Sequence, residues 1–260
     1  MNDASLFDAS AFEARREALG GRFGVPLVRM AETGSTNDDA LEAAKRGERH
    51  GAVFVADAQR SGRGRRGSAW TSPPAENLTF SVLIRPEAAP ERVSAVALVA
   101  GLAVRDAVAA RVRDAVSLKW PNDVLCTGRK IAGILVESRM EGSAVEAVVV
   151  GIGVNVHMRD LPAEIATIAT SLALLGDPSP SREALLAEIL AGFERRLSRF
   201  EAAGLIPMLS ELNDHDALRG RPITVGDVTG VGCGIGDEGA LLVRDAHGAV
   251  HRVTSGTVRL

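Results

Sequence analysis

Residues 117–156, SLKWPNDVLCTGRKIAGILVESRMEGSAVEAVVVGIGVNV, decide the fold of this chain. The segment contains four apolar runs, and the pieces between them are short and rich in turn-forming residues, a pattern typical of strands joined by tight turns. The runs lie at residues 117–120, 123–126, 130–138 and 144–156. Because strands with such short connections pair antiparallel, the segment predicts a β-meander.

The flanking segments add helices and further strands. Residues 91–112 and 181–203 carry apolar side chains at helical spacing, and Ser181 and Gly204 stand where the second helix would begin and end. Helices are also expected within residues 8–19 and 34–47, and strands at residues 26–30, 51–59 and 77–86. Since helices and strands do not alternate strictly, we expect an α+β fold whose central, mostly antiparallel sheet is flanked by helices.

The sequence pattern changes beyond Asp216. There, short segments with strand-like composition are each bounded by glycine or aspartate. Such spacing is typical of a small β-barrel. We therefore expect three parts, namely an N-terminal helical extension at residues 1–24, a main domain at 25–215, and a small C-terminal β-barrel domain at 216–260.

Composition argues against several classes of function. The 260-residue chain has a formal net charge of -3, whereas proteins that neutralise many phosphates are usually basic. The start, MNDASLFDAS, lacks the cationic and apolar regions of a signal peptide, and no apolar run is long enough to span a bilayer, so we expect a cytoplasmic protein without membrane contact. Cys126 and Cys233 stand far apart and the histidines form no metal-spaced cluster, so no protein-held metal site is expected.

The loop QRSGRGRRG at residues 59–67 concentrates four arginines among three glycines. Glycine permits backbone N–H groups to turn inward around an anion, and guanidinium groups bind phosphate oxygens in pairs. The loop alone is equally compatible with a solvated basic turn or with an RNA-binding Gly/Arg patch. Its context must therefore decide between these alternatives.

Four other motifs accompany this loop, and together the set resembles the biotin–protein ligases from about Val25 to the end of the chain. The motifs are GSTND at 34–38, KWPNDVL at 119–125, RKIAGILVE at 129–137 and GIGVNV at 151–156. The resemblance implies that the main domain binds biotin and ATP and forms biotinyl-5′-adenylate with release of pyrophosphate. It further implies that biotin is then transferred to a lysine of an acceptor protein, with release of AMP.

The resemblance also implies roles for individual residues. Lys130, Arg63 and Arg65 would be the catalytic cations, because fixed positive charge is needed to bring a carboxylate and a triphosphate together. Biotin contacts are implied for Ser35, Thr36, Asn37, Gln59, Gly62, Arg63, Gly64, Arg65, Lys130, Gly133 and Leu135. ATP contacts are implied for Arg65, Arg66, Trp70, Lys119, Asn122, Asp123, Lys130 and Asn155, with Trp70 stacked on adenine. A plain helix cap is the structural alternative for Ser35 or Thr36.

Cofactor and partners follow from the same resemblance. Mg²⁺ would arrive with ATP and be held mostly by phosphate oxygens, and the acceptor would be the biotin-carrier domain of a carboxylase. Some relatives carry an N-terminal helix-turn-helix and many form homodimers. Here we expect no sequence-specific DNA binding, because few residues precede Val25, while a homodimer is possible.

Two rival functions remain open. A lipoate–protein ligase shares the expected fold and the adenylate chemistry, but its glycine-rich RR…GGG segment is not found in this sequence. A non-catalytic Gly/Arg nucleic-acid-binding protein would leave Lys130, Trp70 and the KWPND segment unexplained. Pyrophosphate release that depends on biotin and not on lipoate separates the three functions.

Overall fold

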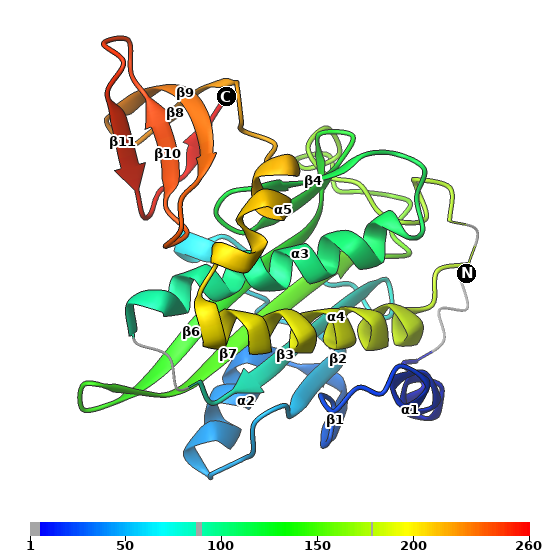
Figure 1. Ribbon diagram of the computed structural model, residues 1–260. Helices are drawn as coiled ribbons and strands as arrows, with labels where there is room; N and C mark the ends of the chain where they lie inside the picture. The colour runs from blue at the N-terminus through cyan, green and yellow to red at the C-terminus, as the bar shows by residue number, and fades with distance from the viewer. Residues whose placement is uncertain (1–5, 87–89, 178) are drawn as a thin grey trace.

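A seven-stranded sheet forms the centre of the molecule in the computed structural model, which describes residues 6–86, 90–177 and 179–260 (Figure 1). The strand order is β1-β2-β3-β7-β6-β5-β4. The strands are β1 (Leu27–Thr33), β2 (Val53–Gln59), β3 (Asn77–Ile84), β4 (Val116–Lys119), β5 (Asp123–Cys126), β6 (Arg129–Glu141) and β7 (Ala144–Asn155). β1 and β2 pair in parallel and every other neighbouring pair is antiparallel. The expected α+β class and the meander are therefore confirmed.

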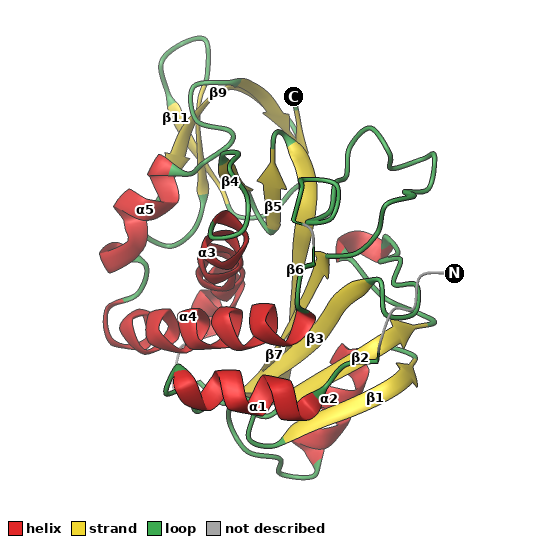
Figure 2. Cartoon of the chain, turned by 90° about the vertical axis from the view of Figure 1, so that its right-hand side faces the viewer, coloured by secondary structure: helices red, strands yellow, loops and turns green. Residues whose placement is uncertain are grey.

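Helices cover both faces of this sheet (Figure 2). α1 (Ala9–Ala18), α3 (Val96–Ala109) and α4 (Arg182–Ala203) lie on one face, and α2 (Thr36–Lys45) lies on the other. The Asp8 carboxylate accepts hydrogen bonds at the start of α1 and the Ser181 hydroxyl accepts one from Ala184 N in α4, as N-caps do. The α3 segment begins later than expected, because the residues before it form the 3₁₀ helix η2 (Pro90–Ala95).

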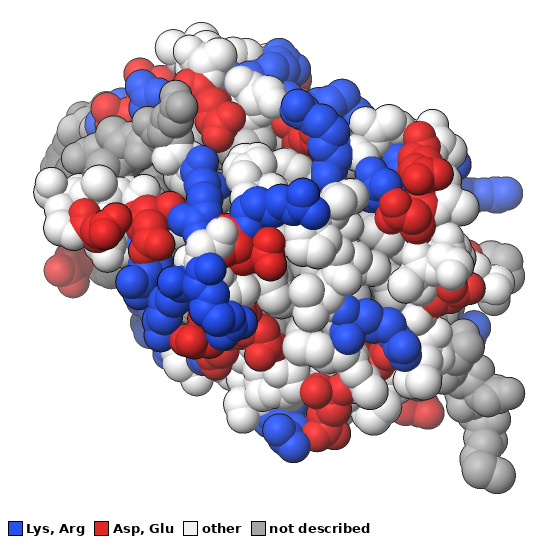
Figure 3. All heavy atoms as spheres, turned by 90° about the horizontal axis from the view of Figure 1, so that it is seen from below, with Lys and Arg blue, Asp and Glu red and all other residues white. Residues whose placement is uncertain are grey.

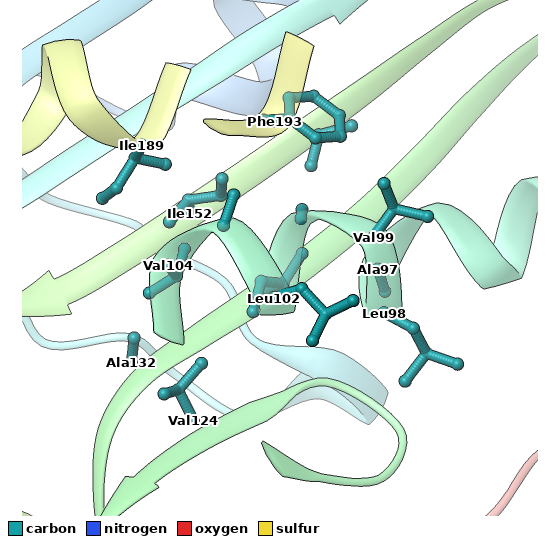
Figure 4. Close-up of a cluster of buried hydrophobic side chains, with 14 of the residues drawn as sticks. Ala97, Leu98, Val99, Leu102, Val104, Val124, Ala132, Ile152, Ile189 and Phe193 are labelled. Atoms are coloured by element: carbon teal, nitrogen blue, oxygen red, sulfur yellow. The ribbon is translucent and has the colours of Figure 1, made fainter. Parts of the chain in front are cut away.

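The main core lies between α3, α4 and the sheet (Figure 4). Leu102 and Val104 of α3, Ile152 of β7, and Ile189 and Phe193 of α4 gather in one cluster on the same face of the sheet, and all five side chains are buried. α3 is apolar around most of its circumference, so it must be enclosed by neighbours rather than lie on a surface. This packing fixes β6 and β7, the strands that carry much of the candidate site.

The C-terminal region forms a second, five-stranded antiparallel sheet in the order β11-β10-β9-β8-β12. It comprises β8 (Pro222–Val225), β9 (Val228–Ile235), β10 (Leu241–Arg244), β11 (Val250–Val253) and β12 (Val258–Arg259), and it follows η3 (Ile206–Met208) and α5 (Leu209–Asp214). Among the described residues no pairing joins β11 to β12, so the expected barrel is not closed. β12 is two residues long and its pairing is to β8.

Two features are absent from the described part of the chain: a membrane-spanning helix and a group of metal-binding side chains. No helix in residues 6–86, 90–177 or 179–260 combines the length and apolar character that crossing a bilayer requires. Within the same ranges, His, Cys, Asp and Glu side chains form no group of three that could hold a metal ion.

Candidate active site

A cavity of about 410 Å³ lies where the arginine loop, the start of α2, strands β6 and β7 and the KWPND turn meet. Its lining includes most of the residues that the sequence suggested, from segments more than 80 positions apart. These residues are Ser35, Thr36, Asn37, Gln59, Arg63, Gly64, Arg65, Arg66, Trp70, Lys119, Asn122, Asp123, Lys130, Gly133 and Leu135. The structure thus brings the five motifs to one place, although the roles of the individual residues stay predictions.

The GSTND motif presents a polar cluster to this cavity rather than a plain helix cap. Ser35 occupies the N-cap position of α2 but its side chain makes no capping hydrogen bond. Thr36 donates twice to Gln59 Oε1, from its backbone nitrogen at 2.8 Å and from its hydroxyl at 3.2 Å. Ser81 Oγ lies 2.8 Å from Thr36 Oγ1 and 2.6 Å from Asn37 Oδ1. The hydroxyl and amide groups of this cluster are therefore held in place beside the cavity. They can offer both donors and acceptors to a neutral polar ligand.

The arginine loop folds back on itself as a short hairpin. Gly64 N donates to Ser68 O at 2.7 Å and Trp70 N donates to Gly62 O at 2.9 Å. A Cβ atom on Gly62 would collide with the Trp70 carbonyl oxygen, so glycine is needed there for close approach of the two strands. Gly62 supports the hairpin in this way and does not itself line the cavity.

Arg63 is held by two carboxylates that sequence reasoning did not select. Its guanidinium donates to Asp38 at 2.6 and 2.7 Å and to Glu137 at 3.0 and 3.3 Å. The hydrogen bonds that Arg63 donates to Asp38, and then those that it donates to Glu137, outweigh burial and raise the pKa of Arg63. The group is permanently cationic but already neutralised by neighbours, so an anionic ligand must compete for it.

Arg65 and Arg66 also line the cavity, but their environments differ from that of Arg63. Burial, and then the neighbouring Arg66 charge, lower the pKa of Arg65, and an anion bound beside this guanidinium would offset both effects. Arg66 has a left-handed backbone, φ 55°, and its Nη1 donates to Thr257 Oγ1 at 3.2 Å. Gly256, Thr257 and Val258 complete the cavity wall from the C-terminal sheet, and no local sequence signal marks them.

Lys130 stands opposite the loop, on β6. Its Nζ lies 2.7 Å from Asp123 Oδ1 and 5.8 Å from the centroid of the Trp70 ring. Its backbone is clamped by hydrogen bonds to Ile168 O and from Thr170 N, each 2.8 Å long. The backbone of Lys130 is therefore fixed, and its ammonium group is held by Asp123 at the cavity, where a compact point charge suits converging anionic oxygens.

Two amide side chains of the predicted set are engaged with the backbone. Asn122 Nδ2 donates to Ile134 O at 2.8 Å, and Ile134 N donates to Asn122 O at 2.9 Å. Asn155 is buried, and its Nδ2 donates to Thr170 O at 2.9 Å. Asn155 does not line the cavity, and its contact with adenine stays a prediction.

Comparisons with known proteins agree with this geometry. A model described as the biotin/lipoate A/B protein ligase family matches residues 31–155. The biotin–[acetyl-CoA-carboxylase] ligase of Mycobacterium tuberculosis is 36% identical over 245 residues, covering 88% of this chain and 86% of that protein. Its namesake from Paracoccus denitrificans is 35% identical, covering 84% and 94%.

Solved structures extend the likeness to three dimensions. The biotin protein ligase from Aquifex aeolicus in complex with biotin and ATP superposes with a TM-score of 0.77 at 28% identity, covering 89% of this chain and 97% of that one. With relatives of this identity matched over most of both lengths, the chain belongs to the biotin protein ligase family.

Proposed function

We propose that this chain is an ATP-dependent ligase that converts biotin to biotinyl-5′-adenylate, releasing pyrophosphate, and then transfers biotin to a lysine of a biotin-carrier protein. The observation that carries this proposal is the convergence of Arg63, Arg65, Arg66 and Lys130 on one cavity with the polar cluster around Gln59. Relatives named as biotin–[acetyl-CoA-carboxylase] ligases, and a relative solved with biotin and ATP, support it.

Charge explains the cationic half of the cavity. A carboxylate that attacks a triphosphate is repelled by it, and charge gathers on the phosphorus oxygens in the transition state. We assign Lys130 as the main catalytic cation, with Arg63 and Arg65 beside it. Lys119 and Arg66 line the same cavity and would contact the outer phosphates. Preorganised cations of this kind also lower the entropy cost of bringing the two anions together.

The polar half of the cavity fits the uncharged end of biotin. A cyclic urea offers both donors and a carbonyl acceptor, which the cluster of Ser35, Thr36, Asn37 and Gln59 can match. Gly133 and Leu135 would border the apolar rings and chain. Trp70 lines the same cavity with its ring against Gly133 and Gly153, and its aromatic ring would stack on adenine.

We propose that ATP binds as its Mg²⁺ complex. Among the described residues that line the cavity, Asp123 is the one carboxylate. Mg²⁺ in nucleotide sites takes one or two protein carboxylates and fills its other positions with phosphate oxygens and water, so this donor set fits the ion. When bound, Mg²⁺ would neutralise phosphate charge, and Asp123 would be its protein ligand.

The second step needs an acceptor amine. The lysine nitrogen forms a bond to the biotin carbonyl carbon while the bond to the adenylate oxygen breaks, the electron pair leaves on AMP, and the amine's protons pass to solvent. We propose the biotin-carrier domain of a carboxylase as acceptor, a cytoplasmic location, and a possible homodimer. The boundaries at residues 24/25 and 215/216 are part of the same proposal.

The decisive experiment combines the chain with biotin, Mg-ATP and a biotin-carrier domain. The mass of the carrier should rise by one biotinyl group, and pyrophosphate release should require biotin. Lipoate in place of biotin should give neither signal, and the reverse preference would show a lipoate–protein ligase instead.

A Gly/Arg nucleic-acid-binding protein predicts binding without ATP turnover. On the face shown in Figure 3, acidic side chains lie among the basic ones rather than leaving an unbroken basic surface. The Arg63 charge is moreover matched by Asp38 and Glu137. Both features favour a small anionic ligand held in a cavity over a nucleic-acid backbone.

A further inference from the structure

One buried hydroxyl group stands behind the wall of the proposed active-site cavity. Ser81 of β3 is fully buried and is not among the residues that line the cavity. Its Oγ atom nevertheless lies 2.8 Å from Thr36 Oγ1 and 2.6 Å from Asn37 Oδ1, and both of those residues line the cavity. Ser81 can therefore act on a bound molecule only through Thr36 and Asn37.

The position of the Asn37 side chain is fixed by the bare backbone of β7 beneath it. Gly151 of β7 pairs with Ser81 of β3 on one side and with Leu135 of β6 on the other. A Cβ atom on Gly151 would collide with Asn37 Oδ1, so glycine is needed there for the close approach of the amide. The Asn37 side chain thus lies on the sheet between β3 and β6.

The partners of the Asn37 amide also fix its orientation. Its Nδ2 atom donates to Glu137 Oε2 at 2.6 Å, and Leu135 O lies 3.4 Å away. Both partners are acceptors, because one is a backbone carbonyl and the other is a carboxylate paired with Arg63. The Oδ1 atom therefore faces Ser81 and can only accept, so Ser81 gives its single hydroxyl proton to Asn37.

The use of that proton leaves Ser81 Oγ as an acceptor toward Thr36. The Thr36 hydroxyl also carries a single proton, and two acceptors lie within its reach, Ser81 Oγ at 2.8 Å and Gln59 Oε1 at 3.2 Å. Gln59 Oε1 already accepts from the Thr36 backbone nitrogen. When the hydroxyl proton turns to Ser81, the Thr36 oxygen can accept a hydrogen bond from a ligand in the cavity.

We propose that Ser81 is a positioning residue for the cyclic urea of biotin. Ser81 accepts the Thr36 proton, and Thr36 Oγ1 then accepts a hydrogen bond from a ureido N–H. Gln59, whose Oε1 is engaged by Thr36, offers its Nε2 donor to the ureido carbonyl. This inference rests on the proposed function and adds to it a residue that does not touch the ligand. The cavity should therefore prefer an N–H donor beside a carbonyl over a ring oxygen in the place of that N–H.

The test compares biotin with its two cyclic carbamate analogues, in each of which one ureido N–H is replaced by a ring oxygen. Calorimetry gives the dissociation constants, and the measured quantity is the ratio of the analogue's constant to that of biotin. Wild-type enzyme should bind at least one analogue about tenfold more weakly than biotin, because a lone pair replaces a donor opposite Thr36. Ser81→Ala should bring that ratio close to one, mostly through weaker binding of biotin.

The kinetics of pyrophosphate release give an independent readout. Ser81→Ala should raise KM for biotin about tenfold and change kcat by less than about twofold. The reason is that the Ser81 hydroxyl acts on the uncharged end of biotin rather than on the reacting carboxylate.

Four further variants make the result specific. Ser81→Thr keeps the hydroxyl group and should retain the wild-type ratio. Ser81→Cys, whose thiol is a weak acceptor, should lower the ratio and replaces Ser81→Ala if that variant does not fold. Ser171 is equally buried, bonds to Met158 O and does not line the cavity, so Ser171→Ala should leave the ratio unchanged. In a Thr36→Val background, Ser81→Ala should not change the ratio further, because the proton that Ser81 accepts is gone.

The outcomes are distinct. Equal weakening of biotin and analogue by Ser81→Ala, with the ratio unchanged, would indicate general damage to the cavity and overturn the inference. Wild-type enzyme that binds biotin and both analogues equally well would also overturn it, because no N–H would then be recognised. Wild-type enzyme that does not bind biotin at all would instead overturn the proposed function, and the inference with it.

Discussion

The indole ring of Trp70 lies against Gly153 of β7 so closely that a Cβ atom on Gly153 would stand 2.7 Å from Trp70 Nε1. Gly153 pairs with Gly133 across β6 and β7, and a Cβ atom on Gly133 would lie 3.6 Å from the same ring. Two facing glycines thus leave a bare patch of sheet that accepts a flat ring. The adjacent Nε1 atom is buried and has no hydrogen-bond partner among the described residues.

Gly153→Ala should therefore displace Trp70 and weaken ATP binding. Loss of one aromatic stacking contact predicts a rise of about three- to tenfold in KM for ATP, with a much smaller change for biotin. Steady-state pyrophosphate release gives both constants. In a Trp70→Ala background the same substitution should add little, because the clash is gone, and full additivity would contradict this explanation.

Lys130→Ala should impair adenylate formation far more than biotin binding. Removal of a preorganised cation from a developing negative charge predicts a loss of about a hundredfold or more in the rate of pyrophosphate release. Biotin affinity, measured by calorimetry, should change far less, because the polar cluster around Gln59 is untouched. Wild-type pyrophosphate release by this variant would refute the assigned role.

The buried ion pair between Arg182 and Asp57 should affect the stability of the fold rather than the rate of catalysis. Arg182 Nη2 lies 2.8 Å from Asp57 Oδ1, and the two side chains are 3% and 1% exposed. Arg182→Leu leaves a buried carboxylate with less compensation and should lower the free energy of unfolding by about 3 kcal/mol.

The matched control is an exposed ion pair. Lys45 lies 2.9 Å from Glu42 with both side chains about half exposed, and Lys45→Ala should change the free energy of unfolding by less than about 1 kcal/mol. Urea unfolding measures both variants. Equal effects in the two would show that burial does not set the strength of the first pair.

The buried carboxyl group of Asp216 should make the free energy of unfolding depend on pH. Burial raises the pKa of Asp216 above its ordinary value, although Asp216 Oδ1 accepts a hydrogen bond from Leu218 N at 2.9 Å. Its other carboxylate oxygen is buried, and within the described chain it has no hydrogen-bond partner. Since the neutral acid is favoured in the fold, stability is fully present below the ordinary pKa and is lost as pH rises through the raised pKa.

Asp216→Asn keeps the Oδ1 acceptor and removes the charge. The variant should be more stable than the wild type near neutral pH, and the difference should shrink toward zero below about pH 4, where the wild-type carboxyl is protonated. Thermal unfolding across this pH range measures the difference. A constant difference at all pH values would show that charge is not its cause.

Most of the fold could be predicted from the sequence because the patterns that indicate its helices and strands are local. The meander at residues 117–156 and the helix from Arg182 to Ala203 follow from apolar spacing, caps and turns within a few positions. The open C-terminal sheet was not predictable in the same way. Closure of a barrel depends on pairing between β11 and β12, and that pairing is set by strand lengths and tertiary packing.

The sequence by itself determined which motifs carry charge, hydroxyls and glycines, and hence which residues were candidates for the cavity. Only the tertiary structure decided that Asp38 and Glu137 flank Arg63, that Thr257 meets Arg66, and that the Asn155 amide turns to Thr170 O. The physical reason is that backbone periodicity acts over a few residues. Ion pairs and cavity walls, by contrast, join side chains that only the folded chain brings within a few ångströms of one another.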